Sequence, residues 1–128
     1  MRLLLDTHIL LWAVSAPDRI PADVLQLLND RNNEPHFSVV NIWEIAIKTG
    51  LGRPSFRVDP GLIRQTLLDN DYRELSIAGA HALAIGDLPA IHKDPFDRML
   101  IAQAAVEDME LFTADATIAR YPGRIRLI

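Results

Sequence analysis

The 128 residues of this chain include no cysteine and no long apolar run. The first absence excludes disulfides, thiolate-bound metals and cysteine nucleophiles, and it is compatible with a reducing compartment. The second argues against a membrane-spanning helix, which needs about 20 predominantly apolar residues in a row. Asp6 and His8 interrupt the N-terminal apolar stretch at the point where a secretory signal would be unbroken. We therefore expect a cytoplasmic protein with no membrane partner.

The chain also lacks an excess of basic residues. It has 13 lysines and arginines against 17 aspartates and glutamates, so its formal net charge is −4 and its pI is near 5.4. A protein of this charge is not steered toward nucleic acid as a whole. A polyanionic substrate would have to be held by local basic residues or by bound cations.

The composition that remains is typical of one folded unit. A chain of this length, with 49% hydrophobic and 23% charged residues, is ordinary for a globular domain, and we expect a single domain over residues 1–128. We find no internal repeat, low-complexity segment or linker.

Apolar runs and helix signals alternate along the chain, with a polar loop expected at 51–59. We expect strands at 2–5, 36–39, 74–76, 110–113 and 125–127, helices at 7–14, 21–30, 41–49, 61–69, 78–85 and 95–107, and a helical turn at 115–119. The alternation predicts an α/β fold, with an open parallel sheet and helices on both faces. In such sheets the functional crevice lies outside the carboxyl ends of the strands.

Two of the expected helices begin with capping signals. Asp94 and Pro95 suit the N-cap and first turn of the last long helix. Asn41 and Glu44 have the spacing of a capping box, although Ser38 can also cap a slightly longer version of that helix.

Four acidic residues follow strand ends or begin helices, and in a parallel sheet all such positions lie at one edge. Two come directly after strands and two lie in the first turns of helices: Asp6, Asp115, Glu44 and Asp97. Four carboxylates in one cleft repel one another, and helix dipoles are too weak to balance them. A hard divalent cation does balance them, and all-oxygen ligation favours Mg²⁺ or Mn²⁺. Such a site suits phosphodiester hydrolysis by an activated water.

Each of these acids also has a purely structural interpretation. Glu44 can pair with Lys48 four residues on, and Asp115 can cap its own short turn. Asp97 is favoured by the helix dipole, whereas Asp94 has so good a capping role that it need not bind metal. The functional interpretation therefore rests on the four acids taken together.

The chain resembles the PIN-domain nucleases, and among them the VapC-like toxins. Four stretches carry the resemblance: LLLDTHILLWAV at 3–14, SVVNIWEIAIKTGLG at 38–52, HKDPFDRMLIAQA at 92–104 and LFTADATIARYPG at 111–123. They cover the start, middle and end of the chain.

The resemblance implies a three-layer α/β/α fold with a small parallel sheet and Mg²⁺- or Mn²⁺-dependent cleavage of RNA. Asp6, Glu44, Asp97 and Asp115 match the family's acidic quartet, with Asp6 and Asp97 as the principal metal ligands. It further implies a homodimer and inhibition by a cognate antitoxin that covers the cleft.

Several other side chains are candidates for supporting roles. Thr7 and Thr113 flank the acids, and Arg98 adjoins Asp97, so these three are candidates for contact with substrate. We expect a structural role for His92, and core packing for both tryptophans.

Other functions fit less of the sequence. A haloacid-dehalogenase-like phosphatase needs a second aspartate two residues after the first, where this chain has His8. A non-catalytic PIN-like binding module would be marked by loss of one of the four acids, and all four are present. A role as co-repressor in an antitoxin–DNA complex can coexist with nuclease activity.

Overall fold

The computed structural model describes residues 1–54 and 57–128. Its core is a five-stranded sheet with the order β3-β2-β1-β4-β5, in which every neighbouring pair is parallel. The strands are β1 Arg2–Leu5, β2 Glu34–Ser38, β3 Arg73–Leu75, β4 Glu110–Thr113 and β5 Ile125–Leu127. The helices are α1 Thr7–Ser15, α2 Ala22–Asn29, α3 Val39–Gly50, α4 Pro60–Asp69, α5 Gly79–Ala84 and α6 Pro95–Glu107, with 3₁₀ turns at Pro17–Arg19, Ile85–Asp87 and Ile118–Arg120.

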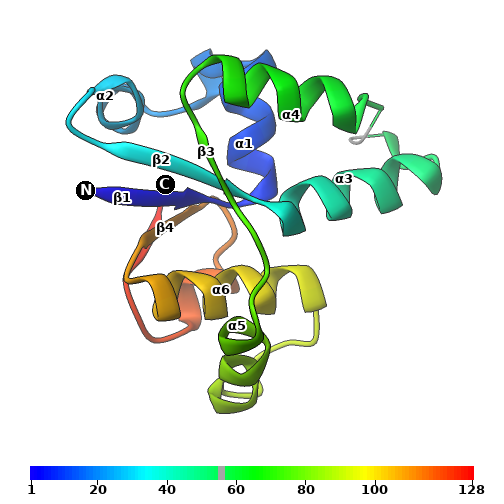
Figure 1. The fold of residues 1–128 in the computed structure, drawn as a ribbon, viewed down its shortest axis with the longest axis vertical. Helices are drawn as coiled ribbons and strands as arrows, with labels where there is room; N and C mark the ends of the chain where they lie inside the picture. Colours follow the sequence, from blue (N-terminus) through cyan, green and yellow to red (C-terminus); the bar gives the residue numbers. More distant parts are fainter. Residues whose placement is uncertain (55–56) are drawn as a thin grey trace.

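The helices cover the sheet from both sides, as the alternation of elements predicts. Figure 1 shows α1, α2 and α4 on one side of the strands and α5 and α6 on the other, with α3 beyond the carboxyl end of β2. The expected three-layer α/β/α arrangement is therefore confirmed.

Each strand supplies both layers of the core, because successive side chains of a strand point to opposite faces. Leu3 and Leu5 pack with the cluster that contains α1, α2 and α4, whereas Leu4 packs with α6. All three leucines are fully buried. This explains why β1 appears in the sequence as a continuous apolar run.

The strand order places a topological switch point between β1 and β4. The chain passes from β1 outward to β2 and β3, and then crosses to β4 on the other side of β1. The carboxyl ends of β1 and β4 are followed by Asp6 and by the segment that contains Asp115. In open parallel sheets this is where ligands bind.

Some expected boundaries were wrong, and capping explains the one that matters for the site. Helix α3 begins at Val39 because Ser38 is its N-cap: Ser38 accepts from the backbone N–H of Val40, and Asn41 accepts from that of Ser38 at 2.7 Å. Asn41 is therefore the capping-box partner and not the cap, and Glu44 has no capping role. Strand β2 begins two residues earlier than expected, at Glu34.

Two further segments, the turn after β4 and the loop before α4, were also given bounds from the sequence. The expected helical turn at 115–119 is instead a 3₁₀ turn at Ile118–Arg120. The expected loop at 51–59 includes residues 55 and 56, which lie outside the described residues. Within the described ranges, no helix is both long and apolar enough to cross a membrane.

Candidate active site

Asp6 is buried at the carboxyl end of β1, with a 4% exposed side chain. It is the N-cap of α1, and its Oδ1 accepts from the backbone N–H of Ile9 at 3.0 Å. Its Oδ2 accepts a short hydrogen bond from the Thr113 hydroxyl. Burial raises the pKa of Asp6, and the bonds from Thr113 and Ile9 only partly oppose that rise.

Thr113 connects Asp6 to the segment after β4. Its fully buried hydroxyl donates to Asp6 and accepts from the backbone N–H of Asp115 at 3.0 Å. Asp115 itself is exposed, and its Oδ1 accepts from the backbone N–H of Thr117 at 2.8 Å. Thr113 thus joins the Asp6 carboxylate to the backbone of Asp115, whose own carboxylate makes the local capping contact that its sequence position allows.

Glu44 reaches the same edge from α3 and is also buried, at 4% exposed. One of its carboxylate oxygens accepts from the Thr7 hydroxyl, and the other is ion-paired with Lys48. Asn41 donates to the Thr7 hydroxyl at 3.0 Å and to the carbonyl of Leu5. The end of β1 and the first turns of α3 are therefore joined by a buried polar network.

Asp97 lies in the first turn of α6 beside Asp94, which caps that helix. The Oδ1 of Asp94 accepts from the backbone N–H groups of Phe96 and Asp97 at 2.9 and 3.1 Å. The Oδ2 of Asp97 is 3.0 Å from Nε2 of His92. Burial raises the pKa of Asp97 to about 6; the hydrogen bond with His92 opposes the rise, and the nearby charges of Asp94 and Glu44 add to it.

The contacts join the four predicted acids only in pairs. Hydrogen bonds link the Asp6 carboxylate to the backbone N–H of Asp115 through Thr113, and the charge of Glu44 acts on Asp97. In the described part of the chain, no group of three or more histidine, aspartate or glutamate side chains is already arranged to hold a metal ion.

The donors nevertheless fit a hard divalent cation. Asp6 and Asp97 are desolvated carboxylates, and neither is paired with a lysine or arginine among the described residues. Isolated buried carboxylates are costly, so they favour protonation or a bound cation. Mg²⁺ needs only one or two protein carboxylates, since it keeps several waters and takes phosphate oxygens.

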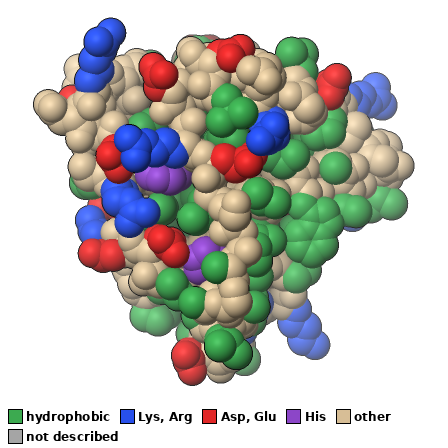
Figure 2. Space-filling model, in the orientation of Figure 1, with side chains coloured by type: hydrophobic (Ala, Val, Ile, Leu, Met, Phe, Trp, Pro, Cys, Tyr) green, Lys and Arg blue, Asp and Glu red, His purple; other side chains and the backbone are tan. Residues whose placement is uncertain are grey.

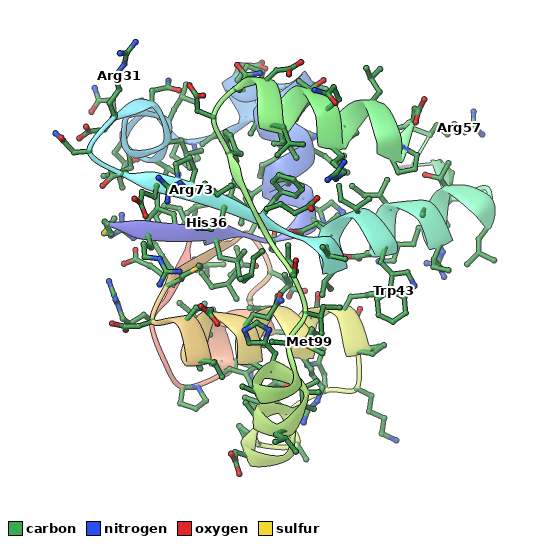
Figure 3. The ribbon with its side chains drawn as sticks, in the orientation of Figure 1. Arg31, His36, Trp43, Arg57, Arg73 and Met99 are labelled. Carbon is green, nitrogen blue, oxygen red and sulfur yellow. The ribbon has the colours of Figure 1, made fainter. Side chains whose placement is uncertain are left out.

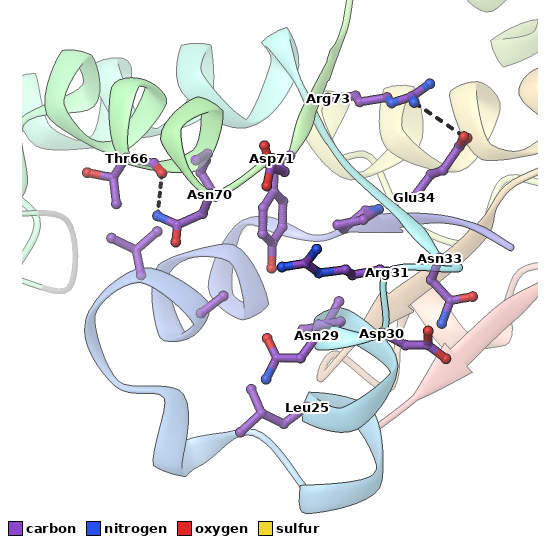
Figure 4. A pocket seen from close by; sticks show the side chains of 16 residues that line it. Leu25, Asn29, Asp30, Arg31, Asn33, Glu34, Thr66, Asn70, Asp71 and Arg73 are labelled. Atoms are coloured by element: carbon purple, nitrogen blue, oxygen red, sulfur yellow. Dashed lines mark hydrogen bonds and ion pairs between the residues drawn. The ribbon is translucent and has the colours of Figure 1, made fainter.

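A large pocket lies elsewhere. Its volume is about 660 Å³, and it opens where β2 and β3 begin, between the ends of α2 and α4 (Figure 4). Asn29, Arg31, Asn70, Asp71 and Arg73 are among its lining residues. Since none of the four acids lines it, the pocket is separate from the candidate site.

An apolar surface lies close to the acidic edge. Trp43 is 49% exposed, so its expected burial in the core was wrong, whereas Trp12 packs against the core as expected. Figure 3 shows Trp43 pointing from α3 toward the beginning of α6, where it meets the Phe96 ring edge-on at 5.0 Å. In Figure 2 hydrophobic side chains gather on this side of the molecule.

The sequence did not single out two residues of this edge. Asn41 is a fully buried junction between α3 and Thr7, and only its suitability as a cap drew attention to it. Tyr121 contacts His92 from 29 residues away, a contact that no local pattern signals. Arg98 donates to the carbonyls of Pro89 and His92 and to Tyr121, so its contact with substrate stays a prediction.

The fold and site together define a parallel α/β domain with acidic side chains at its switch point. A comparison with known families matches residues 3–124 to the PIN domain, so the chain belongs to the PIN-domain family, whose members are generally nucleases. No significant relative is found among curated protein sequences.

Solved structures with the same fold come from toxin–antitoxin complexes. VapBC2 from Rickettsia felis, bound to a DNA fragment from its promoter, aligns with a TM-score of 0.73 at 16% identity, over 99% of this chain and 98% of that one. DNA-bound VapBC from Salmonella typhimurium aligns with a TM-score of 0.68 at 16% identity, over 98% of this chain and 97% of that one. VapBC-1 from nontypeable Haemophilus influenzae aligns with a TM-score of 0.62 at 21% identity, over 94% of this chain and 91% of that one. At these identities the similarity shows the fold.

Proposed function

We propose that this protein is a divalent-metal-dependent endoribonuclease and the toxin of a toxin–antitoxin pair. The observation that carries the proposal is that Asp6, at the carboxyl end of β1, and Asp97, in the first turn of α6, are both desolvated carboxylates in a PIN-domain fold. A desolvated carboxylate that has no lysine or arginine partner among the described residues makes sense where a cation is to be bound.

Asp6 and Asp97 would hold the cation, and Glu44 and Asp115 would complete its surroundings, partly through water. When bound, Mg²⁺ or Mn²⁺ supplies an activated water and stabilises charge on phosphodiester oxygens. It also reverses the local charge, which lets an acidic protein accept a polyanion.

The chain's own residues keep this site in order. Thr113 holds one oxygen of Asp6, and the backbone N–H of Ile9 holds the other. Thr7 holds Glu44, whose second oxygen is paired with Lys48. These contacts fix the carboxylates before substrate arrives, which lowers the reorganisation that a reaction would require. We assign no covalent nucleophile, and the expected RNA ends are a 5′-phosphate and a 3′-hydroxyl.

A protein antitoxin is the partner we propose, together with a second copy of the chain in a homodimer. The similar structures from Rickettsia felis and Salmonella typhimurium are complexes of toxin and antitoxin, and both are bound to DNA. We place the protein in the cytoplasm, where its RNA substrate and its antitoxin would be found.

Cleavage of a panel of labelled structured RNAs tests the proposed activity. We expect cutting with Mg²⁺ or Mn²⁺, none with EDTA, and none by Asp97→Asn. The matched control is Asp94→Asn, which removes the neighbouring charge but retains a good N-cap, and it should still cut. Cutting that survives EDTA and Asp97→Asn would exclude the metal mechanism. A protein that neither cuts RNA nor binds metal would favour a non-catalytic binding module.

A further inference from the structure

His92 lies between the candidate ligand Asp97 and the phenol of Tyr121. Its Nε2 is 3.0 Å from Oδ2 of Asp97, and its Nδ1 is 2.7 Å from the Tyr121 hydroxyl. Tyr121 is only 4% exposed and packs in the α6 core cluster. The ring of His92 is thus held at both nitrogens, on one side by a residue fixed in the core.

The donors around Tyr121 determine where its proton goes. Arg98 donates to the hydroxyl oxygen at 2.9 Å, and the backbone N–H of His92 donates to it at 3.3 Å. Neither group can accept a hydrogen bond, so together they use the two lone pairs of the phenol oxygen. The phenol proton then points to Nδ1 of His92 at 2.7 Å, since the alternative acceptor, the His92 carbonyl, is 3.4 Å away.

This direction fixes the tautomer of His92. Because Nδ1 accepts from Tyr121, the ring proton of the neutral imidazole is on Nε2. The Nε2–H group therefore donates to Oδ2 of Asp97. Among the described residues, no hydrogen bond reaches the other oxygen, Oδ1.

We propose that His92 is a positioning residue for Asp97: Tyr121 and Arg98 set its tautomer, its Nε2–H holds Oδ2, and Oδ1 is left for the divalent cation. This inference rests on the proposed metal site.

The first measurement is the tautomer of His92 by ¹⁵N NMR of the metal-free protein near pH 7.5. We expect protonation at Nε2 alone in the wild type. In Tyr121→Phe the hydrogen bond to Nδ1 is lost, so the ¹⁵N resonance of Nδ1 should shift, while the contact with Asp97 still favours a proton on Nε2. Protonation at Nδ1 in the wild type would overturn the proposed network, whatever the metal does.

The second measurement is the affinity for Mn²⁺ by calorimetry. We expect His92→Ala to bind about 10- to 100-fold more weakly, the loss typical when a ligand's orienting partner is removed. His92→Gln should keep most of the affinity, because its side-chain amide N–H can still donate to Asp97. Lys93→Ala, an exposed neighbour outside the network, should bind as the wild type does. Thermal melts of the metal-free variants show whether each one folds.

The outcomes separate this inference from the proposed function. If the wild type binds no Mn²⁺, the metal site fails and the role of His92 fails with it. If the wild type binds, Asp97→Asn does not, and folded His92→Ala binds as tightly as the wild type, the positioning role alone is wrong. A lower melting temperature in His92→Ala without a change in affinity would likewise assign His92 a merely structural role.

Discussion

Two aspartates of this protein are desolvated ionisable groups: Asp6 is buried, and Asp97 is partly buried. Asp6 is compensated by hydrogen bonds from Ile9 and Thr113, and Asp97 by one from His92. These bonds do not balance a full charge, because burial still dominates and the pKa values of both aspartates are raised. Each is therefore a local cost to the metal-free fold.

That cost predicts how stability depends on pH. With a pKa of about 6 in the folded state against 3.8 for the free side chain, Asp97 binds a proton more tightly when the protein is folded. In EDTA the free energy of unfolding should therefore fall as pH rises from about 4 to about 6, by roughly 2 to 3 kcal/mol from this residue. Above pH 6 this contribution should stay constant.

Urea unfolding of Asp97→Asn beside the wild type measures this contribution. The difference in the free energy of unfolding between the two proteins should appear as pH rises. At pH 7 the variant should be the more stable, because an amide carries no charge to bury. Asp30→Asn, which removes a charge at the opposite edge of the sheet, is the control and should keep the wild-type dependence of stability on pH. A difference that is equal at pH 4 and pH 7 would contradict the prediction.

Thr113 provides a second prediction at this scale. Thr113→Val keeps the shape of the side chain but removes the hydroxyl that donates to the buried Asp6, so it should destabilise the fold by about 1 to 3 kcal/mol. Thr113→Ser keeps the hydroxyl and should lose less. A larger loss of stability in Thr113→Ser than in Thr113→Val in urea unfolding would show that the methyl group, and not the hydrogen bond, is what matters.

The positions of the strands and helices follow from short-range signals in the sequence, whereas the contacts between these elements do not. The continuous apolar run of β1 predicts a buried parallel strand, and Asp94-Pro95 predicts the start of α6; both are confirmed. The start of α3 was misplaced because Ser38 and Asn41 are both good caps, and only the geometry decides between them. Trp43 was expected in the core because the sequence does not reveal which side of α3 remains uncovered.

The same distinction holds for the site. A parallel sheet brings strand ends to one edge, so the acids could be chosen from the order of elements alone. The partners of those acids could not, because Thr113 meets Asp6 across 107 positions and Tyr121 meets His92 across 29. Such contacts depend on tertiary packing and leave no local pattern.

The cap of α6 gives a prediction at the scale of the element. Asp94→Ala removes the acceptor for the backbone N–H groups of Phe96 and Asp97 and should lower stability by about 1 kcal/mol. Asp94→Asn should lower it little, since asparagine caps as well as aspartate does. Both variants should still bind Mn²⁺ in calorimetry. Loss of binding in Asp94→Asn would make Asp94 the ligand.

At the scale of the whole molecule, the net charge of −4 and the acidic edge of the sheet both call for added positive charge where a polyanion is to bind. For the proposed action on RNA, an acidic protein must gain positive charge at the site of reaction, and the proposed divalent cation would supply it there. The ion would bind the folded state far better than the unfolded chain, in which the four acids are scattered from position 6 to position 115. Metal binding should therefore stabilise the fold as a whole.

Thermal unfolding with and without Mn²⁺ tests this consequence. At a free concentration about 100 times the dissociation constant, the ion should add roughly 2.7 kcal/mol to the free energy of unfolding, and EDTA should reverse the gain. Asp6→Asn and Asp97→Asn should lose the stabilisation, because each removes a proposed principal ligand. Asp30→Asn removes the same charge at the opposite edge of the sheet, near the large pocket, and should keep it. If all three variants responded to Mn²⁺ as the wild type does, the ion would be acting through the net charge of the surface, and the switch point would not be its binding site.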